Sequence, residues 1–324
     1  MIAANPRIRA WLTAALLVLL VGVVSGCSST VSTTAKAPSS TTDGRILTSN
    51  LNTPYSSGNI PGILTRALRV VSYNIRWPSP NDGLDRWDVR RHRVAQTIER
   101  LRPDVLGVQE CFAFQAEYLA AELPGYRYVG VGRDDGEQRG EMTAIFIRSE
   151  RLLLAGQGHL WLSDTPGIPG SIGWDAALTR MATWVVVTDR SNSNTWLIVN
   201  THFDHRGRTA RTESAKLLGR FIRDKTEELG GDIAVVLMGD FNSGVDSAPY
   251  LALCAAIDGP RLADTYRAAR RPRDGGSAST FNGFRNRTNS GRIDWLLVTP
   301  GVSTLEAGID RVTIDGRNPS DHDA

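Results

Sequence analysis

Short runs of apolar, often β-branched residues recur from residue 69 onward and predict a set of β-strands. Most runs are apolar at nearly every position, as expected for strands that are buried on both faces of a sheet. Polar residues follow many of them directly, so the strands would bring polar side chains to a sheet edge. The predicted strands are residues 69–75, 105–109, 126–131, 143–147, 183–188, 195–200, 233–238 and 293–298.

Two longer segments repeat apolar residues with the period of an α-helix. Residues 87–101 place Val94 and Ile98 on one side, and a proline follows the segment. Residues 208–229 place Ile222 inward, and two glycines that can end a helix come next. Amphipathic helices between buried strands predict an α/β protein in which helices cover sheets.

The first 26 residues have the pattern of a targeting segment. Two arginines precede an apolar stretch at residues 10–24, which is shorter than the roughly 20 residues of a membrane-spanning helix. The run Val-Ser-Gly-Cys at residues 24–27 resembles a bacterial lipobox, in which the cysteine is acylated and becomes the new N-terminus. We therefore predict a signal peptide at residues 1–26 and lipidation of Cys27. A plain secretory signal and an uncleaved anchor helix are the alternatives.

Residues 27–62 are rich in Ser, Thr, Pro, Gly and Asn and show no apolar period. Such a segment cannot bury enough surface to offset the entropy of ordering, so we interpret it as a flexible tether. Residues 63–324 then form one large α/β domain. We expect a monomer that a lipid holds on the cell membrane, facing the extracytoplasmic or periplasmic side.

Polar motifs stand at the ends of the predicted strands. Carboxylates and carboxamides suit a hard cation such as Mg²⁺, with Mn²⁺ as an alternative. Paired His and Asp suit proton transfer and charge stabilisation at phosphorus. Each motif alone is explained by a turn, but together they indicate a metal-dependent phosphoester hydrolase. The motifs are Ser-Tyr-Asn-Ile-Arg at 72–76, Gln109-Glu110, Gly140-Glu141, Asn-Thr-His at 200–202, Gly-Asp-Phe-Asn at 239–242, Ile-Asp-Trp at 293–295 and Ser-Asp-His at 320–322.

Burial indicates Glu110 as the principal metal ligand. It closes a continuous apolar strand, where an ionised carboxylate is costly unless it is paired or bound to a metal. Asp294 lies in a predicted strand and needs a partner for the same reason, which His322 could supply. Asn74 could bind a cation or cap a turn, and His202 could be a structural histidine. The residues alone leave these last two roles open.

The motifs in this order, over residues 69–322, resemble the endonuclease/exonuclease/phosphatase superfamily of nucleases, sphingomyelinases and inositol-phosphate phosphatases. The most specific are the motifs at 239–242 and 320–322, and the run Thr-His-Phe-Asp-His at 201–205 is most similar to bacterial members. The resemblance implies an α/β (α+β) fold, a four-layer α/β/β/α sandwich of two mixed sheets flanked by helices. Periodicity alone does not give this arrangement.

The resemblance also implies a Mg²⁺ site. Asn74 and Glu110 would bind the ion, and Asp321 could add a direct or water-mediated contact. Some members carry an aspartate where this chain has Arg76. A second metal at that position is therefore not expected.

Four further residues would act on the phosphate and the water. His202 would contact the phosphate, with Glu141 as the carboxylate that orients its ring and raises its pKa. Asp240 would orient and deprotonate the attacking water. Asn242 would hold the scissile phosphate or that water.

Asp294 and His322 would form a second carboxylate–histidine pair. In the resembled family this histidine contacts the phosphate or transfers a proton, and the sequence leaves both roles open. The implied reaction is one in-line displacement by water without a covalent intermediate. We rank phosphodiesters, such as nucleic acid or phospholipid headgroups, above phosphomonoesters as substrates. The alternative is a non-catalytic phosphate- or ligand-binding module on the same scaffold.

Aromatic and charged residues beside the motifs are weaker candidates for substrate recognition. A ring could stack on a base or cover an acyl group, and an arginine could bind a second phosphate. Packing and surface salt bridges explain such residues as well. The candidates are first Trp174, Arg180, His205 and Arg208, and then Asp204, Arg211, Phe281 and Phe284.

The overall charge gives little support to a nucleic-acid partner. The formal net charge is +3, and removal of residues 1–26, which carry two arginines and no acidic residue, lowers it to +1. A nearly neutral protein argues against a tightly bound, processive nuclease. Cys111 and Cys254 are expected as buried free thiols.

The end of the chain departs from the resembled family. Members usually continue with another apolar strand after the histidine that corresponds to His322. This sequence stops at Ala324. We therefore expect the domain at residues 63–324 to lack its last strand.

Overall fold

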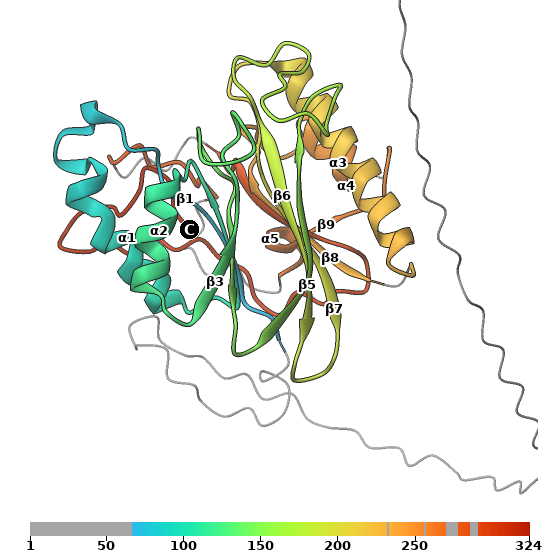
Figure 1. The fold of residues 1–324 in the computed structure, drawn as a ribbon, viewed down its shortest axis with the longest axis horizontal. Coiled ribbons are helices and arrows are strands. Elements are labelled where there is room, and N and C mark those ends of the chain that lie inside the picture. The colour runs from blue at the N-terminus through green and yellow to red at the C-terminus, as the bar shows by residue number, and fades with distance from the viewer. Residues whose placement is uncertain (1–66, 232, 256, 270–277, 286–290) are drawn as a thin grey trace, which may run out of the picture. The chain divides into compact units, whose positions relative to one another are not determined.

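Two mixed β-sheets face each other in the computed structural model (Figure 1). The structure describes residues 67–231, 233–255, 257–269, 278–285 and 291–324. The predicted signal peptide at 1–26, the tether at 27–62 and the lipidation site Cys27 lie outside these residues. In the described part of the chain, no helix is long and apolar enough to cross a membrane.

The smaller sheet has four strands in the order β1-β2-β4-β3. β1 and β2 run parallel, and the other two pairs are antiparallel. β2 coincides with the strand predicted at residues 105–109, and its apolar residues are buried. The strands are β1 Val70–Asn74, β2 Val105–Gln109, β3 Tyr126–Val129 and β4 Ile145–Arg148.

The larger sheet has six strands in the order β5-β6-β7-β8-β10-β9. β7 and β8 are parallel, whereas the remaining neighbours are antiparallel. Both sheets are therefore mixed, as predicted. The strands are β5 Leu152–Trp161, β6 Met181–Asp189, β7 Thr195–His202, β8 Ala234–Asp240, β9 Ala263–Asp264 and β10 Asp294–Val298.

Helices cover the outer face of each sheet, so the predicted four-layer α/β/β/α sandwich is confirmed (Figure 1). One apolar core lies under α1 and α2, a second lies under α3 and α4, and a third fills the space between the sheets. The helices are η1 Pro80–Asp85, α1 Trp87–Leu101, α2 Ala113–Glu122, α3 Arg208–Glu228, α4 Ala248–Cys254 and α5 Thr265–Ala268.

Strand β5 and helix α2 were not predicted, and each has a weak apolar pattern. β5 is an edge strand that contains Gly156 and Gly158 and has an irregular register near Leu154. α2 is short and buries mainly small or polar residues. The free thiols are as expected, except that Cys254 is only half-buried.

A polar side chain joins the two sheets inside the third core. The Asn200 amide on β7 donates to the backbone carbonyls of Val108 (2.9 Å) and Ala144 (3.0 Å) in the other sheet. Its oxygen accepts a bond of 2.7 Å from the side chain of Gln109. A Cβ at Gly107 would lie 2.8 Å from Asn200, so glycine permits this close approach. The bonds fix how one sheet lies on the other.

We predict that Asn200→Ala destabilises the protein by about 2–4 kcal/mol, because three buried hydrogen bonds between the sheets are lost. Urea unfolding followed by circular dichroism measures the change. Asn194→Ala, at an exposed position, is the matched control and should stay within about 0.5 kcal/mol of the unmodified protein. Equal effects of the two substitutions would contradict a structural role for the Asn200 bonds.

Candidate active site

The strand registers bring acidic and histidine side chains to one edge of the larger sheet. His202 ends β7 and lies opposite Asp240, which ends the parallel strand β8. Asp294 begins the antiparallel strand β10 and also lies opposite Asp240. In the smaller sheet, Asn74 ends β1 and Glu110 directly follows β2. Both sheets therefore deliver polar residues to the same site.

Asp240 is the fully buried centre of this site. Its Oδ2 accepts a bond of 3.0 Å from Asn74 in the other sheet. The Nε2 atoms of His202 and His322 lie 3.5 Å and 3.7 Å from the same oxygen. Burial, and then the nearby charge of Asp294, raise the pKa of Asp240 to about 7. A carboxylate with this pKa can accept a proton near neutral pH.

His322 and Asp294 form the predicted pair, with 2.9 Å between Nδ1 and Oδ2. Burial alone would lower the pKa of His322, but Asp294 and Asp240 raise it well above its usual value. The ring is therefore a cation held between two carboxylates. The Phe281 ring packs edge-on against it, with 5.1 Å between ring centroids.

His202 is in the opposite state. Its Nε2 lies 3.0 Å from the Asn242 side-chain nitrogen, a donor, so this ring nitrogen acts as the acceptor. Burial, and then the charge of Arg180, hold the pKa of His202 well below its usual value. His202 is therefore neutral and can donate from Nδ1. The expectation of a raised pKa is wrong for this structure, because desolvation and nearby arginines outweigh the carboxylate.

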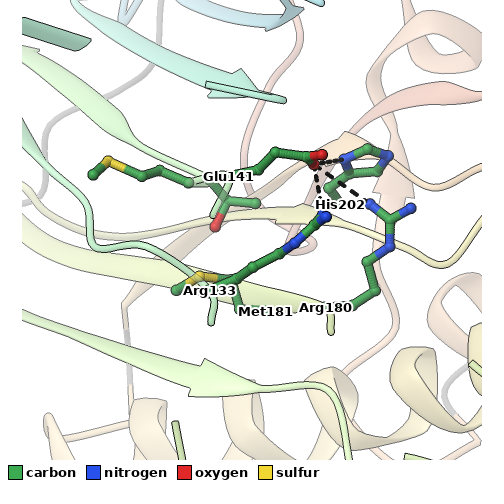
Figure 2. A pocket seen from close by; sticks show the side chains of 7 residues that line it. Arg133, Glu141, Arg180, Met181 and His202 are labelled. Carbon is green, nitrogen blue, oxygen red and sulfur yellow. Dashed lines mark hydrogen bonds and ion pairs between the residues drawn. The ribbon is translucent and has the colours of Figure 1, made fainter. Parts of the chain in front are cut away.

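Glu141 does lie beside His202, but its strongest partner is an arginine (Figure 2). Its Oε2 is 3.9 Å from His202 Nδ1 and 2.5 Å from Arg133 Nη1. Arg180 Nη1 also approaches to 3.9 Å. Burial raises the pKa of Glu141, and the two guanidinium groups oppose this. Arg133 was not predicted, because it lies in a charged loop with no motif around it.

Asn74, which contacts Asp240, provides a hard oxygen donor together with Glu110 and Asp321. The Asn74 amide donates to Glu110 Oε1 over 3.2 Å. Asp321 is buried, and burial together with the charge of Glu110 raises its pKa, so the two carboxylates lie close enough to repel each other. A divalent cation would relieve this repulsion. The three residues fit a Mg²⁺ or Mn²⁺ site.

A second group of possible ligands consists of Asp240, Asp294 and His322, with ligand atoms within 4.8 Å of one another. The protonated His322 ring already supplies one positive charge to these two carboxylates. A cation beside Glu110 stays a prediction. Arg76, at the position where a second metal was not expected, reaches Asp321 with its own positive charge at 3.5 Å.

Two residues of this site have strained backbone conformations. Glu110 and Asn242 adopt left-handed conformations, with φ of 57° and 47°, which non-glycine residues rarely adopt. Gly239, with φ of 149°, passes so close to Thr201 that an added Cβ would lie 2.0 Å from its carbonyl oxygen. The turns after β2 and β8 thus aim two polar side chains into the site.

The structure separates the weaker candidates for substrate recognition. Arg180 is buried, lies 3.6 Å from Asp204 and contacts His205 Nδ1 at 3.1 Å, so it belongs to the cluster around Glu141. Trp174 is half-buried, and His205 and Arg208 are exposed. These three remain candidates for substrate contact.

A model of the Endonuclease/Exonuclease/phosphatase family matches residues 71–322, and the chain therefore belongs to this family of phosphoester hydrolases. Among sequence relatives, an uncharacterised mimivirus protein is 31% identical over 165 residues, 49% of this chain and 60% of that protein. A second mimivirus protein is matched over 32% of its length. The chain thus spans less than two thirds of these relatives.

Solved structures cover the domain more fully. A family member from Bacteroides thetaiotaomicron has 36% identity and a TM-score of 0.72, over 79% of this chain and 94% of that one. A mannosyl-6-phosphatase of the same organism has 35% identity and a TM-score of 0.71, over 79% and 97%. The human nocturnin catalytic domain, with 18% identity, a TM-score of 0.59 and coverage of 79% and 91%, shares the fold.

We predict that Asp294→Asn destabilises the protein most at acidic pH. Because the folded pKa of His322 is raised, its pairing energy is fully present below the unfolded pKa of about 6.5. This energy is lost as pH rises through the folded value, so the difference between the two proteins should shrink. Urea unfolding between pH 5.5 and 9.5 measures it. Asp315→Asn, beside exposed His92, is the control, and a pH-independent difference for Asp294→Asn would contradict the assignment.

Proposed function

We propose that this protein is a Mg²⁺-dependent phosphoester hydrolase that activates water directly. The observation that carries the proposal is the convergence on Asp240 of residues from both sheets. A base with a raised pKa, a cationic His322 and the oxygen donors around Glu110 lie side by side. Such a set suits attack by water on phosphorus.

Each residue has a distinct part in this proposal. Asp240 orients the attacking water and takes its proton. The His322 cation donates to the phosphate oxygens, where negative charge develops in the transition state. The Asn242 amide donates to His202 Nε2 and to the Phe203 carbonyl, and so positions His202. Neutral His202 accepts from Asn242 at Nε2 and faces Glu141 with its Nδ1, so both ring nitrogens are oriented by neighbouring side chains. Bound Mg²⁺, held by residues on the side of Glu110, would neutralise phosphate charge and stabilise the leaving oxygen.

The proposed class of phosphoester rests on similarity to a solved structure. The mannosyl-6-phosphatase is 35% identical and matched over nearly its whole length. This favours a phosphomonoester of a sugar, although the sequence alone ranked phosphodiesters first. The competing function is a phosphate-binding module without catalysis. The retained Asp240 and His322 argue against it, since binding alone requires no base.

The proposed location is the extracytoplasmic side of the membrane, with the enzyme acting as a lipid-anchored monomer. Its support is the lipobox-like run that ends at Cys27 and the polar segment that follows it. Two or more acyl chains on Cys27 would give stable anchoring. The enzyme would then meet substrates outside the cytoplasm.

We predict that Asp240→Asn lowers turnover by a factor on the order of 10²–10⁴, the usual contribution of a general base, and retains Mg²⁺ affinity. Glu110→Gln should instead weaken Mg²⁺ binding, because a charged ligand is lost. Turnover of p-nitrophenyl phosphate and bis-p-nitrophenyl phosphate, together with calorimetric Mg²⁺ titration, separates the two effects.

The controls are Asp224→Asn and Glu117→Gln, both at exposed helix positions. Near-normal turnover of folded Asp240→Asn would exclude the proposed base, and unchanged Mg²⁺ affinity of Glu110→Gln would exclude the proposed ligand. Inactivity of the unmodified protein on every phosphoester would favour the binding module.

We predict that Cys27→Ser moves the protein from the membrane fraction to the soluble or secreted fraction, because no acyl chain can be attached. Immunoblots of fractionated cells measure the shift. Ser28→Ala keeps the cysteine and should remain with the membrane. Retention of Cys27→Ser in the membrane fraction would support an uncleaved anchor helix.

A further inference from the structure

A cavity of about 390 Å³ opens beside Asp321. Its volume lies at the lower end of the range for small-molecule sites, and it is too large for a phosphate group alone. The mechanism above uses only Asp321 at its inner end. The lining residues are Arg76, Asn81, Asp82, Asp85, Phe281, Gly283, Phe284, Arg285 and Asp321.

The charges in this cavity do not suit a second phosphate. Arg76 makes two bonds of 3.1 Å to Asp82, and its Nη1 lies 3.5 Å from Asp321. This guanidinium is therefore already shared between two carboxylates. The other lining arginine, Arg285, is exposed. A second dianion would enter next to three carboxylates, which would repel it.

The polar side chains of this cavity can instead form hydrogen bonds with the hydroxyl groups of a ligand. Asp85 Oδ1 accepts both bonds from Arg317, at 2.7 Å and 3.1 Å, and among the described residues Oδ2 takes no donor. Each Asp82 oxygen accepts one Arg76 bond and keeps a lone pair for another donor. The exposed Asn81 side chain can both donate and accept. Neighbouring hydroxyls of a polyol could bond to this mixed set.

Two aromatic rings also line the cavity. Phe281 and Phe284 are half-buried, so part of each ring faces open space. Phe281 packs against His322, with 5.1 Å between centroids, and Phe284 lies 5.7 Å from the Arg90 guanidinium carbon. Rings held in this way can pack against the apolar C–H face of a sugar.

We propose that this cavity is a carbohydrate subsite, which binds the sugar of a sugar phosphate while the phosphate lies at His322, beside the lining residue Phe281. The inference rests on the proposed hydrolase function and extends it, since it names the residues that select the leaving group. Carboxylates bond the hydroxyls, and the two phenylalanines pack against the ring carbons. A nucleoside or a second phosphate is not the favoured occupant.

The test compares kcat/KM on a hexose 6-phosphate with kcat/KM on p-nitrophenyl phosphate. Phe284→Ala and Asp85→Asn should each lower this ratio about tenfold or more, mainly through KM, because sugar contacts are lost while the reacting phosphate is the same. Asp224→Asn, on the outer helix α3, should keep the ratio of the unmodified protein. Ratios within twofold of that value in both variants would overturn the subsite. So would a preference of the unmodified protein for adenosine monophosphate over the hexose phosphate.

A binding measurement keeps this test independent of turnover. Saturation-transfer NMR with methyl α-mannoside should give ring-proton signals with the unmodified protein and weaker signals with Phe284→Ala. If no phosphoester is hydrolysed but these signals appear and depend on Phe284, the proposed hydrolase function fails and the subsite stands. If phosphoesters are hydrolysed but both proteins give the same signals or none, the subsite fails and the hydrolase function stands.

Discussion

The bonds from the Asn200 amide to the opposite sheet are the constraint on which the site depends. Asn74 and Glu110 come from the smaller sheet, whereas His202 and Asp240 come from the larger one. Apolar packing between sheets is non-directional and tolerates sliding. The hydrogen bonds from Asn200 to two backbone carbonyls are directional and do not tolerate sliding. The Asn200 bonds therefore hold the two sheets in the positions at which Asn74 and Asp240 make their 3.0 Å contact.

The two histidines have opposite protonation states because their neighbours differ. His322 lies between two carboxylates and keeps its proton, whereas His202 has arginines nearby and a carboxylate already bound to Arg133. Similar side chains at equal burial thus supply a cation and a neutral donor within one site. Asp240 contacts both rings, so its own protonation state depends on the different charges of the two histidines.

The sequence predicted most strands and the long helices, because buried strands and amphipathic helices have strong periods. It also predicted that Asp294 pairs with His322, since a carboxylate in a strand needs a partner. The neutral state of His202 was not predictable, because its lowered pKa depends on burial and on Arg180 and Arg133, which the fold brings beside it. Phe281 and Phe284 were candidates for substrate recognition, but the cavity that they line could not be predicted, because η1 and a distant loop build it together. The local sequence pattern therefore predicts helices and strands, whereas the charges of a site depend on residues that only the fold brings together.

The left-handed backbone at Glu110 and Asn242 has a consequence for the evolution of this protein. Such conformations cost on the order of 1–3 kcal/mol each, and glycine would relieve most of that cost. Selection for heat tolerance alone would therefore favour glycine at Glu110, even though the oxygen donor would disappear. Stability and chemistry compete at this one position. A thermostable laboratory variant of this enzyme would need stabilising substitutions at other positions, for example on the exposed surface of its outer helices.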